Sequence, residues 1–466
     1  MHTNEQILQR NIDITLPHDD FYEDLRAREF GRLDTNKQIY LDYTGGNLYA
    51  LTQLEKHVAL LKNNIFGNPH SMNPASAFST QLVEEARTKV LQFFNAEDYY
   101  CIFTPNATGA LKIVGESYPF EENGRLLLLA DNHNSVNGIR EFCITKDGKF
   151  DYATIHYEDL MIDADSLDEK LSKPCDCDHK LFAFPAQSNV SGVRHDLSWV
   201  TRAQELGWDV LLDAAAYVPT SKLDLRTIQP DFVSISFYKI FGYPTGIGCL
   251  LVKKDKFELL HKRWFAGGTV TMVSILSPHH FLASNHERFE DGTVNYLDIP
   301  AISTGLDFIE TIGMHRIHAR VDGLIQYLTE SIATLQHDNG RPLIRIFGPD
   351  HHTHAGGTLI MNVLDINGDQ YPFESVERNA SDHGISIRSG CFCNPGIDET
   401  NYCLTEEELA RFYSSRDKGN YADMKLYLGK MRGAIRVSVG YATVQRDIDA
   451  FIAFLKTYLN VAVDVP

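Results

Sequence analysis

The sequence contains no long hydrophobic run, and no stretch approaches the roughly 18 apolar residues of a membrane-spanning helix. The opening residues, MHTNEQILQRNIDI, also lack the apolar segment of a secretory signal peptide. We therefore predict no membrane association and expect a cytoplasmic protein.

Positive charge is scarce as well. The 466 residues include 43 lysines and arginines against 62 aspartates and glutamates, which gives a formal net charge of −19 at pH 7. Nucleic acids and anionic membranes are bound by basic surfaces, so neither is an expected partner. Cysteine is also sparse, with eight residues, and without a secretory signal these are predicted to be free thiols rather than a disulfide framework.

Length and composition indicate a soluble globular protein of two or three compact units. Hydrophobic residues make up 43% of the chain and charged residues 23%. No internal repeat or low-complexity linker divides the sequence. Residues 1–37 are polar and charged, and we predict that they form an N-terminal arm that packs on a smaller C-terminal domain.

From QIYLDYTGG onward, short apolar runs alternate with helix-like patterns. Runs that are apolar on both faces and separated by longer segments are typical of buried strands in a mostly parallel sheet flanked by helices. These runs predict a large α/β domain over residues 38–300. Its strands are expected in residues 99–103, 125–130, 180–186, 209–217, 231–237 and 248–254.

The pattern changes after about residue 300. A helical stretch over 300–337 precedes GGTLIMNV, and AIRVSVGY precedes a final helix over 445–459. This order predicts a smaller α+β domain over residues 301–466.

Polar residues follow two of the predicted strands, and ligands of open α/β sheets bind at the carboxyl ends of strands. The turn TPNATG, residues 104–109, opens a helix whose free N–H groups would suit a phosphate. An ordinary helix cap is the alternative. Asp213 ends DVLLD, where it could cap the next helix or face a buried cation or a protonated ring nitrogen.

A single lysine, Lys239, ends an aromatic strand in SISFYKIFGYPTGIG. Lysine is seldom fully buried unless paired, and a charged strand end facing water is the simple alternative. Together, however, Lys239, Asp213 and the 104–109 turn supply what pyridoxal phosphate needs: an amine for a Schiff base, an acid for the pyridine nitrogen and a phosphate cradle. Ser236 is placed to add a hydroxyl to that cradle. The three segments predict pyridoxal phosphate as cofactor.

The order of several motifs resembles the class V, fold-type I pyridoxal-phosphate enzymes, which have an aminotransferase-like fold. Within them, the sequence is most similar to the cysteine-desulfurase-like N-terminal domain of molybdenum-cofactor sulfurases, over roughly residues 38 to 460. The motifs are YLDYTGG, FTPNATGALK, DNHNSVNGIRE, SNVSG, DAAAYVPT, SFYKIFGYPTGIG, RFEDGT, RSGCFCNPG and IRVSVGYAT.

The resemblance implies a role for each matching residue. Lys239 would be the Schiff-base lysine, and Asp213 would pair with the pyridinium nitrogen. His133 would stack on the cofactor ring and take part in catalysis. The cofactor phosphate would be held by Ala107, Thr108, Ser236 and Tyr238, and by Thr269 from a second subunit. Asn189 would bind the phenolic oxygen of the cofactor and the substrate. Arg436 would clamp the substrate carboxylate.

A cysteine pair, Cys391 and Cys393, lies in RSGCFCNPGIDETNYC. The resemblance implies that Cys393 is a nucleophile that takes sulfur from L-cysteine as a persulfide, with Cys391 as a neighbour that could resolve or relay it. Such a thiolate should lie on a mobile, accessible loop, and glycine and proline here oppose regular structure. Two cysteines supply only half a zinc site, so no metal is predicted.

The sequence also departs from the sulfurase pattern. Ile397-Asp398 replaces the final pair of the common NPGAC, and the second domain that binds the molybdenum cofactor is not expected here. The prediction is therefore a homodimeric cysteine desulfurase-like enzyme that releases alanine and serves an unidentified sulfur acceptor. A class V carbon–sulfur lyase or aminotransferase acting on another amino acid, and a non-catalytic partner subunit, remain as alternatives.

Overall fold

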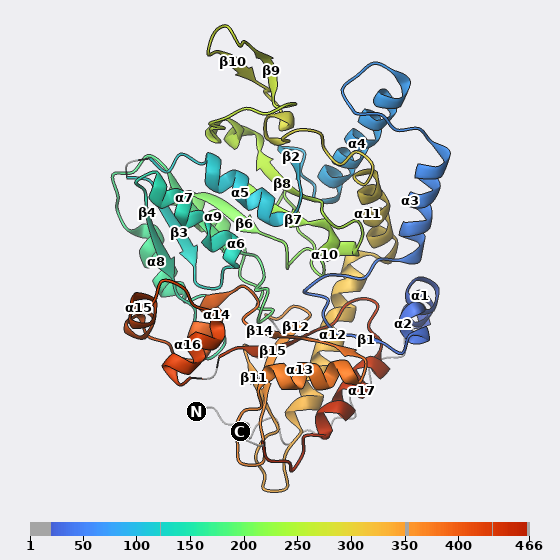
Figure 1. Ribbon diagram of the computed structural model, residues 1–466, viewed down its shortest axis with the longest axis vertical. Helices are drawn as coiled ribbons and strands as arrows, with labels where there is room; N and C mark the ends of the chain where they lie inside the picture. The colour runs from blue at the N-terminus through green and yellow to red at the C-terminus, as the bar shows by residue number, and fades with distance from the viewer. Residues whose placement is uncertain (1–19, 122, 350–353, 431, 464–466) are drawn as a thin grey trace.

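A computed structural model describes residues 20–121, 123–349, 354–430 and 432–463. Most of the predicted N-terminal arm, residues 1–19, therefore lies outside the described residues. Figure 1 shows a large α/β region that carries the central sheet, with a smaller region below it built from the C-terminal part of the chain. Within the described ranges, no helix combines the length and apolarity needed to cross a bilayer.

The central sheet of the large region has the strand order β2-β8-β7-β6-β5-β3-β4, and every strand except β8 runs in the same direction. The prediction of an α/β fold with a mostly parallel sheet is confirmed. The strands are β2 (Tyr99–Thr104), β3 (Arg125–Leu129), β4 (Lys149–Ala153), β5 (Lys180–Pro185), β6 (Asp209–Asp213), β7 (Phe232–Ser236) and β8 (Gly248–Lys253).

The apolar runs of the sequence are explained by burial on both faces of this sheet. In β3, Leu127 and Leu129 pack into one hydrophobic core, whereas Leu126 and Leu128 pack into a second core on the opposite face. The edge strand β4 was not predicted, because its KFDYA sequence is mostly exposed and polar.

Helices cover the large region (Figure 1). They are α3 (Leu51–Asn63), α4 (Pro74–Phe93), α5 (Ala107–Ser117), α6 (Asn134–Asn137), α7 (Ile139–Thr145), α8 (Ala164–Ser172), α9 (Ser198–Glu205), α10 (Phe237–Phe241) and α11 (Pro300–Ile312), with the 3-10 turns η2 (Lys254–Leu259) and η3 (His286–Phe289). A hairpin of β9 (Val270–Val273) and β10 (His280–Leu282) projects from the body.

The smaller region contains an antiparallel sheet with the order β11-β12-β15-β14. Its strands are β11 (Ile344–Phe347), β12 (Thr358–Val363), β14 (Arg388–Gly390) and β15 (Ala434–Ser438), and β1 (Ile39–Tyr40) pairs separately with β13 (Ile385–Ser386). The helices are α12 (Met314–Ala333), α13 (Phe373–Asp382), α14 (Pro395–Asn401), α15 (Glu406–Ser414), α16 (Tyr421–Leu428) and α17 (Gln445–Lys456). The predicted domain limits stay predictions.

Three expectations need correction. The helical stretch 300–337 is two helices, because Gly313 adopts a φ of 89° that favours glycine and interrupts the helix. The strand predicted over 209–217 ends at Asp213, where the chain turns. Cys175 and Cys177 are paired as a disulfide, so free thiols are found only for the other six cysteines, all of which lie in described parts of the chain.

The described part of the N-terminal arm, with α1 (Asp20–Phe30) and α2 (Arg32–Thr35), contacts the smaller region through a buried arginine. Arg26, 1% exposed, donates from Nη1 to the carbonyl of Ala442 (2.7 Å) and to Oδ2 of Asp447 (3.1 Å), and its Nη2 pairs with Asp34 (3.0 Å). Burial raises the pKa of Asp447, so Arg26 is needed to keep that carboxylate charged.

Replacing Arg26 should destabilise the fold strongly. Arg26→Met would leave the Asp447 carboxylate buried without its cation, and we expect the free energy of unfolding to fall by about 3 kcal/mol. Arg28→Met, which removes a 65% exposed arginine paired with Glu29, should change it by less than about 1 kcal/mol. Urea unfolding measures both, and equal losses would contradict the role of Arg26.

Candidate active site

A cavity of ≈ 180 Å³ lies where β5, β6 and β7 end and α5 begins. Most of the residues singled out from the sequence line it, although they come from segments far apart in the chain. They are Ala107, Thr108, His133, Asn189, Asp213, Ser236, Tyr238 and Lys239. Cys393, Arg436 and Thr269 are not among the residues that line this cavity.

Lys239 lies in the short helix α10, one turn beyond the end of β7, and not on the strand itself as expected. The chain leaves this helix at Gly242, whose φ of 81° favours glycine. Burial lowers the pKa of the Lys239 amine, and the charges of Arg436 and Arg388 lower it further, whereas Asp213 and Cys393 raise it. The structure therefore favours a neutral, nucleophilic amine at this position.

Asp213 ends β6 and faces the same cavity. Its Oδ1 accepts hydrogen bonds from the Ala215 N–H (3.1 Å) and from Oγ of Ser234 (2.8 Å). Because both hydrogen bonds are accepted by Oδ1, Asp213 caps the turn that follows and still offers Oδ2 to the cavity. The two interpretations of this residue are thus compatible.

The turn before α5 is held against the end of β7. Asn106 caps the helix by accepting from the Gly109 N–H (3.0 Å), and Ser236 Oγ accepts from the Ala107 N–H (2.9 Å). A Cβ on Gly248 would come within 2.7 Å of the Asn106 carbonyl carbon, so only glycine permits this close approach. The helix N-terminus, with its positive dipole end, is thereby aimed into the cavity beside Thr108.

His133 is half-buried at the start of α6, where its Nδ1 accepts from the Ser135 N–H (3.1 Å). Burial lowers the pKa of this imidazole, and the nearby Lys239 and Arg436 lower it further against the opposing effect of Asp213. A neutral ring with a flat apolar face is therefore presented to the cavity.

Arg436 lies on β15 and is 3% exposed, so the alternative of a surface strand charge is wrong. Its Nη1 donates to the Asn189 carbonyl (2.8 Å) and its Nη2 to Oδ1 of Asp42 (2.8 Å). The other oxygen of Asp42 accepts from Arg388 (2.7 Å). Sequence reasoning missed Asp42 and Arg388; the available signal was their positions in the motifs YLDYTGG and RSGCFCNPG.

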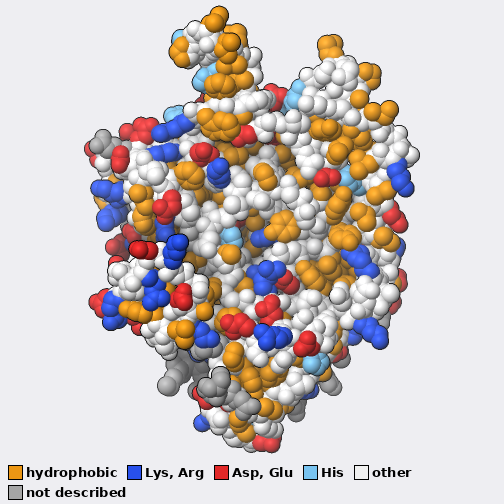
Figure 2. Space-filling view, viewed as in Figure 1, with side chains coloured by type: hydrophobic (Ala, Val, Ile, Leu, Met, Phe, Trp, Pro, Cys, Tyr) orange, Lys and Arg blue, Asp and Glu red, His pale blue; other side chains and the backbone are white. Residues whose placement is uncertain are grey.

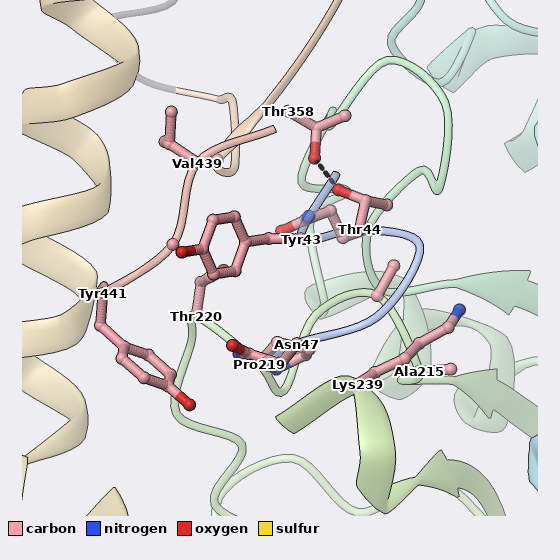
Figure 3. A pocket seen from close by; sticks show the side chains of 14 residues that line it. Tyr43, Thr44, Asn47, Ala215, Pro219, Thr220, Lys239, Thr358, Val439 and Tyr441 are labelled. Carbon is pink, nitrogen blue, oxygen red and sulfur yellow. Dashed lines mark hydrogen bonds between the residues drawn. The ribbon is translucent and has the colours of Figure 1, made fainter. Parts of the chain in front are cut away.

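A water-sized pocket of ≈ 20 Å³ continues from Lys239 toward the smaller region. Figure 3 shows Lys239 and Ala215 at one end and the rings of Tyr43 and Tyr441 at the other. The hydroxyl groups of Thr44 and Thr358 meet here at 2.5 Å. The cleft beside Lys239 is therefore closed by residues of both regions of the molecule.

The two cysteines of the loop after β14 differ in environment. Cys393 is exposed, whereas Cys391 is half-buried beside Tyr421, and burial raises the pKa of its thiol to about 12. Both Phe392 and Cys393 have a φ of 56°, a left-handed conformation that costs of order 1–3 kcal/mol for residues other than glycine. The loop borders a groove of ≈ 800 Å³ that also involves Phe373 and α16.

The backbone of this loop is pinned rather than free. Asn189 Nδ2 donates to the Phe392 carbonyl (2.8 Å), and the Asn134 N–H donates to the Cys393 carbonyl (2.6 Å). The next residue, Asn394, is fully buried and donates from Nδ2 to Asp131 (2.7 Å). The loop is accessible as expected, but these bonds oppose the mobility predicted for it.

Thr269 lies at the base of the β9–β10 hairpin and is fully buried. Its hydroxyl bonds both the N–H and the carbonyl of Ala266 (2.9 Å each). Within this chain the side chain closes a local turn, and its expected reach toward a second subunit stays a prediction.

The fold is that of known cysteine desulfurases. A structure of the enzyme from Thermococcus onnurineus NA1 superposes with a TM-score of 0.78 at 22% identity, covering 96% of this chain and 98% of that one. The cysteine desulfurase CsdA of Escherichia coli, in its S-sulfonic acid form, gives a TM-score of 0.74 at 19% identity, covering 94% and 98%. At these identities the likeness concerns the fold alone.

The family follows from the sequence itself. The family model for class-V aminotransferases matches residues 39–451, and the chain belongs to this family. It is 38% identical to molybdenum cofactor sulfurase of Homo sapiens over 459 residues, covering 93% of this chain and 51% of the relative, and 34% identical to that of Solanum lycopersicum, covering 93% and 57%. The chain thus spans about half the length of the curated relatives it matches.

The residues of the cavity fit pyridoxal phosphate. Lys239 offers an amine to which no hydrogen bond or ion pair is made by any described residue, Asp213 offers a carboxylate, and the N-terminus of α5 offers an anion site. These groups converge on one cavity, which explains why a half-buried lysine is retained there without a local partner.

The uptake of pyridoxal phosphate should report the lowered pKa of Lys239. The amine condenses with the cofactor aldehyde only when it is neutral. The rate of cofactor uptake should therefore rise with pH and level off at a pH below 10.5, the ordinary pKa of lysine. Asp213→Asn removes the charge that raises this pKa, so its rate should level off at a still lower pH. Visible absorbance follows both reactions, and levelling at or above pH 10.5 would refute the assignment.

Proposed function

We propose that this chain is a pyridoxal-phosphate-dependent cysteine desulfurase that takes sulfur from L-cysteine as a persulfide on Cys393 and releases alanine. One observation supports this above the others: the loop of the exposed Cys393 is hydrogen-bonded, through the Phe392 carbonyl, to Asn189, which lines the cavity of Lys239. A loop that carries an accessible thiol therefore borders the cavity of the cofactor-binding lysine. Family membership supports the cofactor.

Each predicted site residue that lines the cavity has a role in this proposal. Bound pyridoxal phosphate supplies an electron sink for charge that develops on the substrate. Asp213 would hold the proton of the ring nitrogen, and His133 would lie against the ring. Thr108, Ala107 and Ser236 would hold the phosphate at the start of α5, and Tyr238 would close that end of the cavity. Lys239, once free of the cofactor, would move protons at the substrate carbons.

The sulfur transfer is balanced by the groups of this chain and the substrate. The Cys393 thiolate forms a bond to the sulfur of L-cysteine while the bond between that sulfur and the β-carbon breaks. The electron pair of the broken bond stays with carbon, which takes up a proton, so the products are alanine and a persulfide on Cys393. Arg436 and Asn189 would bind the substrate carboxylate.

The choice of Cys393 over Cys391 is supported by their surroundings. Thiolates and not thiols are nucleophiles, and a thiol whose pKa is raised to about 12 stays protonated at neutral pH. Burial is the main cause of the raised pKa of Cys391 and Asp398 adds to it, whereas the hydrogen bond with Tyr421 opposes it. We also propose the cytoplasm as the place of action, because six of the eight cysteines are free thiols and only Cys175 and Cys177 are paired.

Two serine variants test the proposal. Cys393→Ser should lose more than about 10³-fold in alanine release and form no persulfide, yet still change its visible spectrum when L-cysteine is added. Cys391→Ser should retain activity within about threefold, because its buried thiol is protonated. Alanine assays and mass spectrometry of the protein measure both. If both variants process the substrate at the wild-type rate, the enzyme is a lyase or aminotransferase instead.

A homodimer is also part of the proposal. The β9–β10 hairpin and the segment between α3 and α4 project from the same end of the large region and carry apolar side chains at their tips (Figures 1 and 2). Exposed apolar surface of this kind marks interaction sites. The most exposed of these residues are Ile275 (99%), Leu276 (96%), Met72 (98%) and Ile65 (81%).

Charges on the hairpin tip should separate the subunits. The double variant Ile275→Asp, Leu276→Asp should weaken dimerisation by at least about thirtyfold and lower cofactor affinity, since Thr269 lies at the base of the same hairpin. Ile144→Asp, a 46% exposed isoleucine on α7, is the matched control and should leave the dimer intact. Analytical ultracentrifugation measures the oligomeric state of both variants. A fully active monomer would exclude a site shared between subunits.

A further inference from the structure

We infer that Phe392 is a positioning residue, which holds the Cys393 thiol at a fixed place relative to Arg436. The inference rests on the proposed function, in which Arg436 binds the substrate carboxylate and Cys393 attacks the substrate sulfur. Phe392 lies between the two cysteines and has no reactive group of its own, so its contribution has to come from its contacts.

Phe392, Arg436 and Asn189 form a closed set of three contacts. The guanidinium carbon of Arg436 lies 4.9 Å from the centroid of the Phe392 ring. Arg436 donates to the Asn189 carbonyl (2.8 Å), and the side chain of Asn189 donates back to the Phe392 carbonyl (2.8 Å). Each member therefore contacts both of the others, and none can move without breaking a contact.

The ring contact is specific to an aromatic side chain. Arg436 uses Nη1 and Nη2 for Asn189 and Asp42, so the Phe392 ring adds an electrostatic contact to a buried cation that no aliphatic side chain can replace. Phe392 is half-buried and packs at the edge of the main hydrophobic core, so a test of the aromatic contact has to keep an apolar side chain at this position.

The contacts matter because the adjacent backbone is strained. Phe392 and Cys393 both hold a φ of 56°, and such strain persists only where surrounding contacts impose it. On the C-terminal side of Cys393, the side chain of Asn394 is hydrogen-bonded to Asp131, and the Cys393 carbonyl accepts from the Asn134 N–H. On the N-terminal side of Cys393, the contact of the Phe392 ring with Arg436 supplies the anchor. Without it, the loop would relax and the sulfur would leave its place relative to Arg436.

This placement predicts an effect on the chemical step rather than on binding. The substrate carboxylate and the substrate sulfur are separated by a fixed number of bonds, so the attacking thiol has to lie at one distance from Arg436. A small displacement of a reacting group lowers the rate steeply, whereas binding at Arg436 does not depend on where the thiol lies.

The test compares two substitutions of Phe392 in the protein loaded with pyridoxal phosphate. Phe392→Leu keeps an apolar side chain but loses the aromatic face, and we expect about a tenfold lower kcat for alanine release from L-cysteine with KM changed by less than about twofold. Phe392→Tyr keeps the face and should restore the wild-type kcat. Tyr413→Leu, an aromatic residue 65% exposed on α15, is the control and should have no effect.

A second measurement does not depend on catalysis. In cofactor-free protein, amide hydrogen exchange over residues 391–396 should be faster in Phe392→Leu than in wild type or Phe392→Tyr, because the loop has lost one of its anchors. Unchanged exchange and kcat in Phe392→Leu, or equal impairment of the leucine and tyrosine variants, would overturn the inference. Wild-type protein that releases no alanine would refute the proposed function instead, and the exchange data would still decide the role of Phe392.

Discussion

A buried guanidinium has to be neutralised and hydrogen-bonded, and Arg436 obtains partners for Nη1 and Nη2 from distant parts of the chain. Asp42 follows β1, Asn189 lies in the loop after β5, and Arg436 itself is in the middle of β15. Taking an arginine out of water costs several kcal/mol, so an arrangement that lacked either partner would be strongly penalised. The smaller region is thereby set against the strand ends of the large sheet, and the cavity around Lys239 is closed.

The same cations shape the chemistry inside the cavity. Arg436 and Arg388 add to burial in lowering the pKa of Lys239, while Asp213 opposes them. The lysine is thus tuned by residues from both regions of the molecule, and one of them, Arg388, belongs to the strand that leads into the cysteine loop. Docking of the two regions and activation of the lysine therefore depend on the same contacts.

The cysteine loop separates two spaces of different character. The enclosed cavity of ≈ 180 Å³ lies on the side of Lys239, and the open groove of ≈ 800 Å³ lies on the side of α16. His133 faces the cavity, whereas the next residue, Asn134, borders the groove and binds the Cys393 carbonyl. In the proposed function, the amino acid is handled in the cavity, and a sulfur acceptor reaches Cys393 from the groove without entering it.

The sequence by itself determined the parallel sheet and much of the site. Runs such as RLLLL indicate burial on both faces, and residues at the carboxyl ends of parallel strands, such as Asp213, necessarily meet at one edge of the sheet. The break at Gly313, the helical position of Lys239, the Asp42–Arg436 pair and the different states of Cys391 and Cys393 were decided only by the tertiary structure. For the Asp42–Arg436 pair and the two cysteines, the physical reason is that burial and charge are set by partners outside the local segment, 394 residues away in the case of Asp42, which no local pattern of apolar and polar residues records.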